Sequence, residues 1–130
     1  MIGLLLGALS LFNSTIKDCT PGGSISNILG FGVSPLNPVP NENASLWVNF
    51  DLFEQVDSGS IVYTYTYNFV PFPPTETNLC EENTCPFTAG IHNVSGTSTF
   101  PDMSGLLEVK IEWNTGDGTP IWCVDASYTV

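Results

Sequence analysis

The sequence predicts an all-β domain built as a two-layer sandwich of about seven short strands. Apolar and polar residues alternate with a period of two in several segments, and clusters of Gly and Pro separate these segments. Beyond the N-terminal residues, no segment has the apolar spacing of an amphipathic helix over a useful length. A chain of 130 residues is long enough for one hydrophobic core and too short for two typical domains.

Three segments show the strand pattern most clearly. In Ala44–Phe53, the even-numbered residues from 46 to 52 are apolar, and in Leu106–Trp113 the odd-numbered residues from 107 to 113 are apolar. In Ile61–Val70, the odd-numbered residues from 61 to 69 share one face. Each pattern is typical of a strand with one buried and one solvated face. The other strands are expected at Ile25–Val33, Thr97–Pro101 and Pro120–Val130.

Proline and glycine predict the connections. Pro71, Pro73 and Pro74 cannot donate ladder hydrogen bonds, so we expect a loop or an irregular edge after Ile61–Val70. The glycines of Asn114–Gly118 supply positive φ, which predicts a tight turn before the final strand.

The charge balance excludes one class of partner. Thirteen Asp and Glu against two basic residues, Lys17 and Lys110, give a formal net charge of −11. A chain with this charge is repelled by phosphate backbones, so we expect no nucleic acid partner. The same charge opposes contact with anionic bilayers, which predicts pH-dependent exchange with such surfaces or handover to a protein.

The N-terminus resembles an export signal. The apolar run from Ile2 to Phe12 is too short to cross a bilayer but has the length of a signal-peptide core. Ala8-Leu9-Ser10 is a small-x-small cleavage pattern, and Ser14 is a second candidate. We therefore expect residues 1–14 to be a signal peptide and residues 15–130 the domain, with a retained buried strand or helix as the alternative.

The cysteines and the glycosylation sequons agree with export. The even number of cysteines in a short chain predicts two disulfides, for which three connectivities are possible. A zinc site is disfavoured because Cys80 and Cys85 are the one close pair, and we expect no metal. Asn43 and Asn93 begin N-x-S sequons, as Asn13 begins an N-x-T sequon, so we expect glycosylation at Asn43 and Asn93.

A series of short motifs extends through most of the mature chain. These motifs are Lys17-Asp18-Cys19, Val33-Ser34-Pro35, Val70-Pro71-Phe72-Pro73, Cys80 with Cys85-Pro86-Phe87, Glu112-Trp113 and Trp122-Cys123. In their order and spacing, they resemble the signature of the ML lipid-recognition domain family.

The resemblance implies a fold and a function. The fold is an immunoglobulin-like sandwich of about seven strands with a lipid cavity between the sheets. The implied disulfides join Cys19 to Cys123 and Cys80 to Cys85. The implied function is to bind one lipid and to transfer it between membranes or to a protein partner, with no catalysis and no cofactor. We expect a monomer that is secreted or lies in the lumen of endosomes or lysosomes.

The resemblance also points to candidate lipid-binding residues. Phe72, between two prolines, is the candidate gate, and Val33 with the segment from Pro101 to Met103 falls at the implied cavity mouth. Inward-facing candidates are Val33, Phe50, Val70, Ile111 and Trp113, each of which can equally be a core residue.

Two ligand classes are compatible with these motifs. The Val-Pro-Phe-Pro run resembles the sterol-transfer branch of the family, which makes a sterol the first expectation. After Ser34-Pro35 the chain has Leu36 and no further cysteine pair, which resembles the phosphatidylglycerol/phosphatidylinositol transfer branch. A third alternative, of another class, is an immunoglobulin-like recognition module with a solid core.

Catalytic readings of the remaining residues are weak. His92 is interpreted as a solvated loop residue, with a pH switch as the sharper alternative. Glu81 and Glu82 are interpreted as solvated charges on a cysteine-bounded loop rather than an acid/base pair. No nucleophile-elbow motif marks a serine, so we expect no enzyme.

Overall fold

The protein folds as two antiparallel sheets packed face to face. The computed structural model describes residues 14–35, 39–99 and 104–129. Its elements in chain order are β1 (Ser14–Asp18), β2 (Ser26–Ser34), β3 (Asn43–Leu52), β4 (Gly59–Tyr67), β5 (Val70–Pro71), β6 (Thr75–Asn78), α2 (Leu79–Glu82), β7 (Gly90–Thr99), β8 (Leu106–Thr115) and β9 (Pro120–Thr129).

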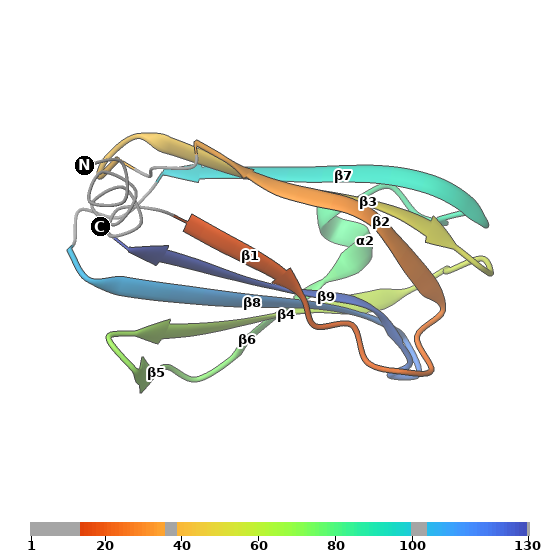
Figure 1. Cartoon of the computed structure of the whole chain (residues 1–130). Coiled ribbons are helices and arrows are strands. Elements are labelled where there is room, and N and C mark those ends of the chain that lie inside the picture. Colours follow the sequence, from red (N-terminus) through yellow and green to blue (C-terminus); the bar gives the residue numbers. More distant parts are fainter. Residues whose placement is uncertain (1–13, 36–38, 100–103, 130) are drawn as a thin grey trace.

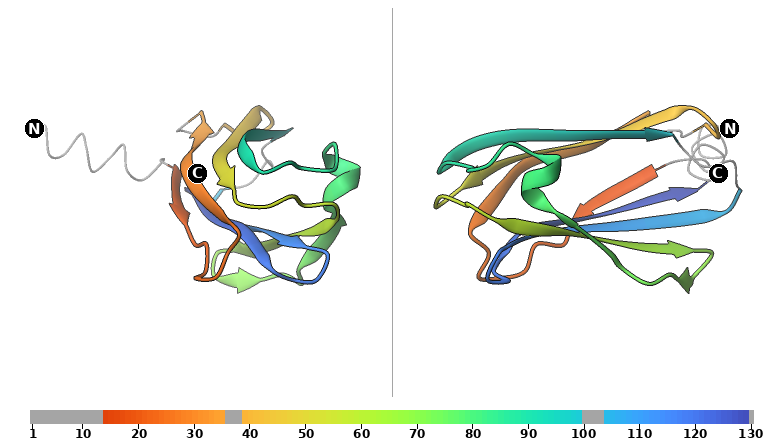
Figure 2. Two further views of the ribbon diagram at one scale, coloured as in Figure 1. Left: turned by 90° about the vertical axis from the view of Figure 1, so that its right-hand side faces the viewer. Right: turned by 180° about the vertical axis from the view of Figure 1, so that it is seen from behind.

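One sheet holds six strands and the other three. The larger sheet has the order β1-β9-β8-β4-β5, with β6 also paired to β4, and the smaller sheet has the order β2-β3-β7. Figure 1 shows the two layers, and the end-on view of Figure 2 shows β2 beside β1 along one edge and α2 at the opposite edge. The prediction of an all-β, immunoglobulin-like sandwich is confirmed.

The strand boundaries differ from the predictions at several places. β7 covers Gly90–Thr99, whereas only Thr97–Pro101 was expected, because its Gly, Ser, Thr and Asn residues show little apolar alternation. β1 pairs along its whole length with β9, although no strand was predicted there. The segment Ile61–Val70 is interrupted after Tyr67, because Asn68 and Phe69 adopt positive φ and turn the chain back into β5.

The expected leader lies almost entirely outside the described residues. β1 begins at Ser14, where its register pairs Ser14 with Tyr128 of β9. Removal of residues 1–14 stays a prediction. Among the described residues, none of the helices has the length and apolarity needed to cross a bilayer.

Alternation places the core as the sequence predicted. On β3, Val48, Phe50 and Leu52 are buried, while Trp47, which immediately precedes Val48, remains 40% exposed on the outer face. On β8, Trp113 is buried and its register partner on β9, Trp122, is buried as well. The apolar inner faces of the two sheets therefore meet, and the outer faces carry polar residues.

The two disulfides join the pairs that the resemblance implied. Cys19 bonds to Cys123, next to the paired strands β1 and β9, and the Cys19 N–H donates to the Cys123 carbonyl oxygen at 3.0 Å. Cys80 bonds to Cys85 and closes the short loop that begins with α2. Both expected connectivities are confirmed.

The single-turn helix α2 closes one edge of the sandwich. The Asn78 side chain accepts a hydrogen bond from the Cys80 N–H at 2.9 Å, and Leu79 is fully buried. Glu82 accepts hydrogen bonds from the hydroxyls of Thr77 at 2.7 Å and Tyr63 at 3.3 Å. Partial burial, together with the charge and hydrogen bond of Glu82, raises the pKa of Tyr63 to about 12.

Replacing Glu82 with Gln tests the contact between Glu82 and Tyr63. The substitution removes the negative charge beside Tyr63, so the pKa of Tyr63 should fall toward 10, while burial keeps it above that value. The stability that neutral Tyr63 contributes is complete below pH 10 and is lost as the pH rises toward 12. Phenolate absorption, titrated in the Glu82→Gln variant and in a Glu81→Gln control, measures the change. Equal tyrosine titrations in the two variants would contradict this contact.

Candidate functional site

A cluster of aromatic rings joins the two sheets at one end. Trp113 of β8 and Trp122 of β9 stack with their ring centroids 4.7 Å apart. Phe50, from β3 in the opposite sheet, lies 5.9 Å from Trp113 and 6.1 Å from Trp122. These rings are at most 5% exposed, so they fix the separation of the sheets at this end.

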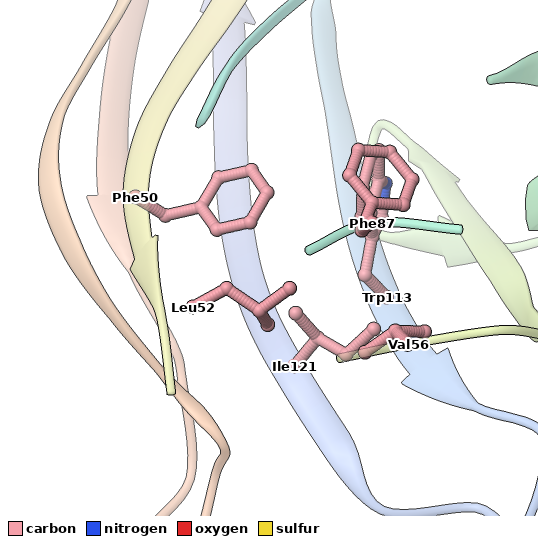
Figure 3. A pocket seen from close by; sticks show the side chains of 6 residues that line it. All are labelled: Phe50, Leu52, Val56, Phe87, Trp113 and Ile121. Atoms are coloured by element: carbon pink, nitrogen blue, oxygen red, sulfur yellow. The ribbon is translucent and has the colours of Figure 1, made fainter. Parts of the chain in front are cut away.

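An apolar gap lies beside this cluster. It is too narrow to admit a water molecule. Figure 3 shows its side chains pointing toward one another from both sheets and from two connecting segments. Val56 and Phe87 hold those segments together through two reciprocal backbone hydrogen bonds of 2.9 Å. The lining residues are Phe50, Leu52, Val56, Phe87, Trp113 and Ile121.

His92 belongs to this cluster, so its interpretation as a solvated loop residue is wrong. It lies within β7, and its register partner is Phe50. Its ring stacks on Phe50 at 5.6 Å and meets the edge of Phe87 at 5.2 Å. Its Nε2 donates to the Thr88 carbonyl oxygen at 2.6 Å, since a carbonyl can only accept. The small, polar residues around it had hidden the strand from sequence analysis.

The other end of the sandwich is less closed. Val33 of β2 packs there with Ala126 and Tyr128 of β9, which seals one edge. Across from them, Tyr65 of β4 remains 38% exposed. On the inner face of β7, no atom of the described residues lies within 4 Å of the position that a Cβ would take at Gly96. At this end, Gly96 of β7 is therefore not packed against the opposite sheet, and Tyr65 of β4 is not fully covered.

The β4–β5 hairpin projects from the same end. Phe69 is 79% exposed, Val70 58% and Phe72 48%. Phe69 has a φ of 67° and Asn68 of 47°, a conformation that is costly for a bulky residue such as phenylalanine. The turn therefore holds an aromatic side chain outward despite a backbone penalty.

Hydrogen bonds to the start of β8 stabilise this turn. The Asn68 N–H donates to the Leu106 carbonyl oxygen, and Asn68 Oδ1 accepts from the Leu106 N–H, both at 2.8 Å. The Tyr67 hydroxyl donates to the Ser104 carbonyl oxygen at 2.6 Å. Gly105 passes so close to Asn68 that a Cβ there would lie 2.5 Å from Asn68 Oδ1. The hairpin is thus attached firmly to the larger sheet.

The structure brings together only some of the predicted lipid-binding residues. Phe50 and Trp113 lie in the aromatic cluster, Ile111 packs against it, and Val33 lies at the less closed end. Val70, expected to face inward, is exposed at the sheet edge because β4 ends at Tyr67. Phe72 is also exposed, and its N–H donates to the Tyr65 carbonyl oxygen at 2.9 Å. Pro101 and Met103 lie outside the described residues.

Four residues of this region were not among the candidates predicted from the sequence. Phe69 and Tyr65 were assigned to one face of a regular strand, and the Asn68 that begins the turn was the signal against a continuous strand. Gly96 lay in the unrecognised half of β7, and Phe87 follows the cysteine loop that was assigned no core role. Among the described residues, no cluster of three His, Cys, Asp or Glu side chains is arranged to hold a metal ion.

This architecture defines an immunoglobulin-like sandwich, closed by aromatic rings at one end and less closed at the other. The family model described as ML domain matches residues 13–130. The chain therefore belongs to the ML domain family. A search of curated protein sequences finds no match.

Solved structures share the fold at low sequence identity. A Niemann-Pick type C2 protein from the Japanese carpenter ant is 15% identical, with a TM-score of 0.71 over 88% of this chain and 98% of that one. Chicken MD-1, solved in complex with lipid IVa, is 13% identical, with a TM-score of 0.67 over 89% and 88%. The C-terminal domain of wzt is 12% identical, with a TM-score of 0.60 over 86% and 74%.

Truncating a cluster residue and a hairpin residue should have different effects. Phe50→Ala removes a buried ring and should lower the free energy of unfolding by about 3–5 kcal/mol. Phe72→Ala removes a half-exposed ring and should cost less than about 1 kcal/mol. Urea denaturation of both variants measures these values. Equal losses would show that Phe72 is as much a core residue as Phe50.

Proposed function

We propose that this protein binds one lipid, a sterol, between its two sheets and transfers it to a membrane or a protein acceptor, without catalysis. The observation that carries the proposal is the unsealed end of the sandwich. There the inner faces carry Tyr65 and the partly buried Leu107 and Val109, while the facing Gly96 has no side chain to fill the space. Apolar surface that the fold leaves partly uncovered favours an apolar ligand.

The energy available from such burial is sufficient for reversible binding. Covering about 400 Å² of ligand at about 25 cal/mol per Å² gives on the order of 10 kcal/mol before the cost of association. Ligand pockets usually measure about 300–1,000 Å³. The apolar gap beside the aromatic cluster does not admit even a water molecule, so a lipid must widen the space between the sheets at the less closed end.

A buried donor offers the ligand a polar contact. Trp122 is 2% exposed, and its Nε1 has no hydrogen-bond partner among the described residues. An unpaired buried N–H is costly, and a ligand oxygen that reached it would remove that cost. Both a sterol hydroxyl and a phospholipid ester oxygen have this chemistry.

The structural neighbours support a lipid ligand. One is a Niemann-Pick type C2 protein, and another, MD-1, was solved with lipid IVa. Export of this chain to an extracellular or endolysosomal compartment is part of the proposal, supported by its two disulfides.

A pair of neighbouring substitutions on β7 tests the binding site. Gly96→Phe places a ring in the space between the sheets, whereas Thr97→Phe places the same ring on the outer face. Gly96→Phe should weaken binding of a fluorescent sterol at least tenfold, and Thr97→Phe should leave it unchanged. Thermal unfolding of both variants serves as the control for folding, since Phe has a higher strand preference than Gly.

The outcomes separate the proposed ligands. Displacement of the probe by unlabelled sterol supports a sterol carrier, and displacement by phosphatidylinositol alone supports a phospholipid carrier of the same fold. Equal probe affinity in the two folded variants would refute binding between the sheets.

The β4–β5 hairpin is the proposed membrane contact. Residues 61–75 contain no Asp, Glu, Lys or Arg, although the chain as a whole is strongly acidic. Glu54, Asp57 and Asp117 lie in loops at the opposite end of the sandwich, beside the turn after β8. Exposed Phe69 lies on a segment without charges of its own, and Glu108 of β8, the register partner of Thr66, is the neighbouring carboxylate whose protonation favours approach to a bilayer.

Replacing Phe69 with Ser should slow lipid transfer to vesicles at least tenfold without weakening lipid binding. Ile91→Ser is the matched control, because Ile91 is 69% exposed but lies on the outer face of the smaller sheet. Transfer to anionic vesicles should be faster at pH 5 than at pH 7, because protonation of carboxylates reduces the net charge of −11. Equal transfer by the two variants would contradict the hairpin contact, and equal rates at the two pH values would contradict the electrostatic part.

One observation favours the alternative of a recognition module with a solid core. The aromatic cluster is fully packed, and the gap beside it does not admit water. Native mass spectrometry of the purified protein distinguishes the two functions. A co-purifying lipid mass supports the carrier, and a ligand-free mass that persists after incubation with sterol and phosphatidylinositol supports the module.

A further inference from the structure

The outer face of the smaller sheet differs from the rest of this acidic protein. The three strands β2, β3 and β7 contain a single charged residue, Asp51. The outer positions of β3 and β7 carry mostly amides and hydroxyls instead. On the larger sheet, both lysines lie in strands together with several carboxylates. The smaller sheet therefore presents an uncharged, hydrogen-bonding face.

An exposed tryptophan lies on this face. The indole of Trp47 rests over Gly30 and Gly32, where a Cβ at Gly32 would come within 2.6 Å of its Nε1. Trp47 nevertheless remains 40% exposed, and Ile91 on the neighbouring strand is 69% exposed. A flat aromatic ring surrounded by amides and hydroxyls suits the apolar face and the hydroxyls of a sugar ring.

Both described sequon asparagines lie on the same face. The register pairs Asn93 with Asn49 and Ser95 with Trp47, so Asn93 is the diagonal neighbour of Trp47. Diagonal neighbours on antiparallel strands are about 7–8 Å apart. Asn43 lies four positions before Trp47 on β3, and both sequon asparagines are exposed. A glycan on Asn93 would therefore begin within reach of the indole.

β7 also has an unprotected edge. It pairs with β3 and with no other described strand. It contains no proline, lysine or carboxylate, and its register with β3 is continuous over ten residues. β2, at the opposite edge of this sheet, is interrupted by a bulge between Ile28 and Gly30. Long, regular and uncharged edges invite association unless something covers them.

We propose that Asn93 and Asn43 carry N-linked glycans and that the Asn93 glycan covers Trp47 and shields the edge of β7. The glycans make the outer face of the smaller sheet a sugar-covered surface. Bulky sugars supply the protection that charges or prolines give to other edge strands. The proposal depends on entry into the secretory pathway and not on lipid binding.

Glycan mapping of the full chain secreted from eukaryotic cells tests the attachment. Enzymatic release converts each glycosylated Asn to Asp, which peptide mass spectrometry identifies. Asn93 and Asn43 should both be converted, Ser95→Ala and Ser45→Ala should each abolish one site, and Asn27→Gln should change nothing. Unmodified Asn93, in cells that glycosylate a co-expressed reference glycoprotein, would overturn the proposal.

Tryptophan fluorescence tests the coverage. Trp113 and Trp122 are buried, so Trp47 accounts for most of the quenching by acrylamide. Releasing the glycans from the native protein should increase the quenching constant, and the increase should be lost in Trp47→Phe and in Ser95→Ala. Light scattering after release should reveal self-association, which an exposed charge on β7, Thr97→Lys, should reduce. Unchanged quenching would refute the contact with Trp47, and a monomer at all concentrations would refute the shielding role.

Discussion

The aromatic contact between Phe50 of β3 and the Trp113–Trp122 stack is the constraint on which the rest of this structure depends. It is the point where rings from both sheets interlock, and it fixes the layer separation at one end only. Phe87 and His92 extend the contact through the segment after α2. We call this set of rings the clamp. From the clamp, the sheets continue toward the β4–β5 hairpin, where glycine and partly exposed apolar residues take the place of the packed rings. One end of the sandwich is therefore tightly packed, and the other is less closed.

Several carboxylates lie at the end of the sandwich that holds the clamp. The connections beside the clamp carry Glu54, Asp57 and Asp117, and hydrogen bonds from Thr115 and Thr119 lower the pKa of Asp117. That carboxylate therefore stabilises the turn above its ordinary pKa, and the contribution is lost as the pH falls through the lowered value. The hairpin at the far end is uncharged and aromatic.

Sequence patterns predicted the parts of this fold that depend on alternation. The buried faces of β3 and β8 follow directly from residues such as Val48, Phe50 and Trp113, because a two-residue period decides which side is covered. The disulfide pairing came from the family resemblance and not from the residues alone. Most of β7 was not predicted, because Gly96 and its small neighbours show no alternation of apolar and polar residues. Phe69 was misassigned because Asn68 changes the backbone from strand to turn. A hydropathy pattern does not reveal a site that depends on a glycine without a side chain or on residues with positive φ.

The place of β9 in the larger sheet has a consequence for biosynthesis. It is the last strand to be made, yet it lies between β1 and β8 and supplies Trp122 and Cys123 to the clamp and the long-range disulfide. Because translation proceeds at about 5–20 residues per second, β9 is made seconds after the strands that precede it. During this interval the larger sheet lacks the strand that joins β1 to β8, and Cys19 lacks its disulfide partner. The smaller sheet is therefore made in full before the opposite layer can be completed.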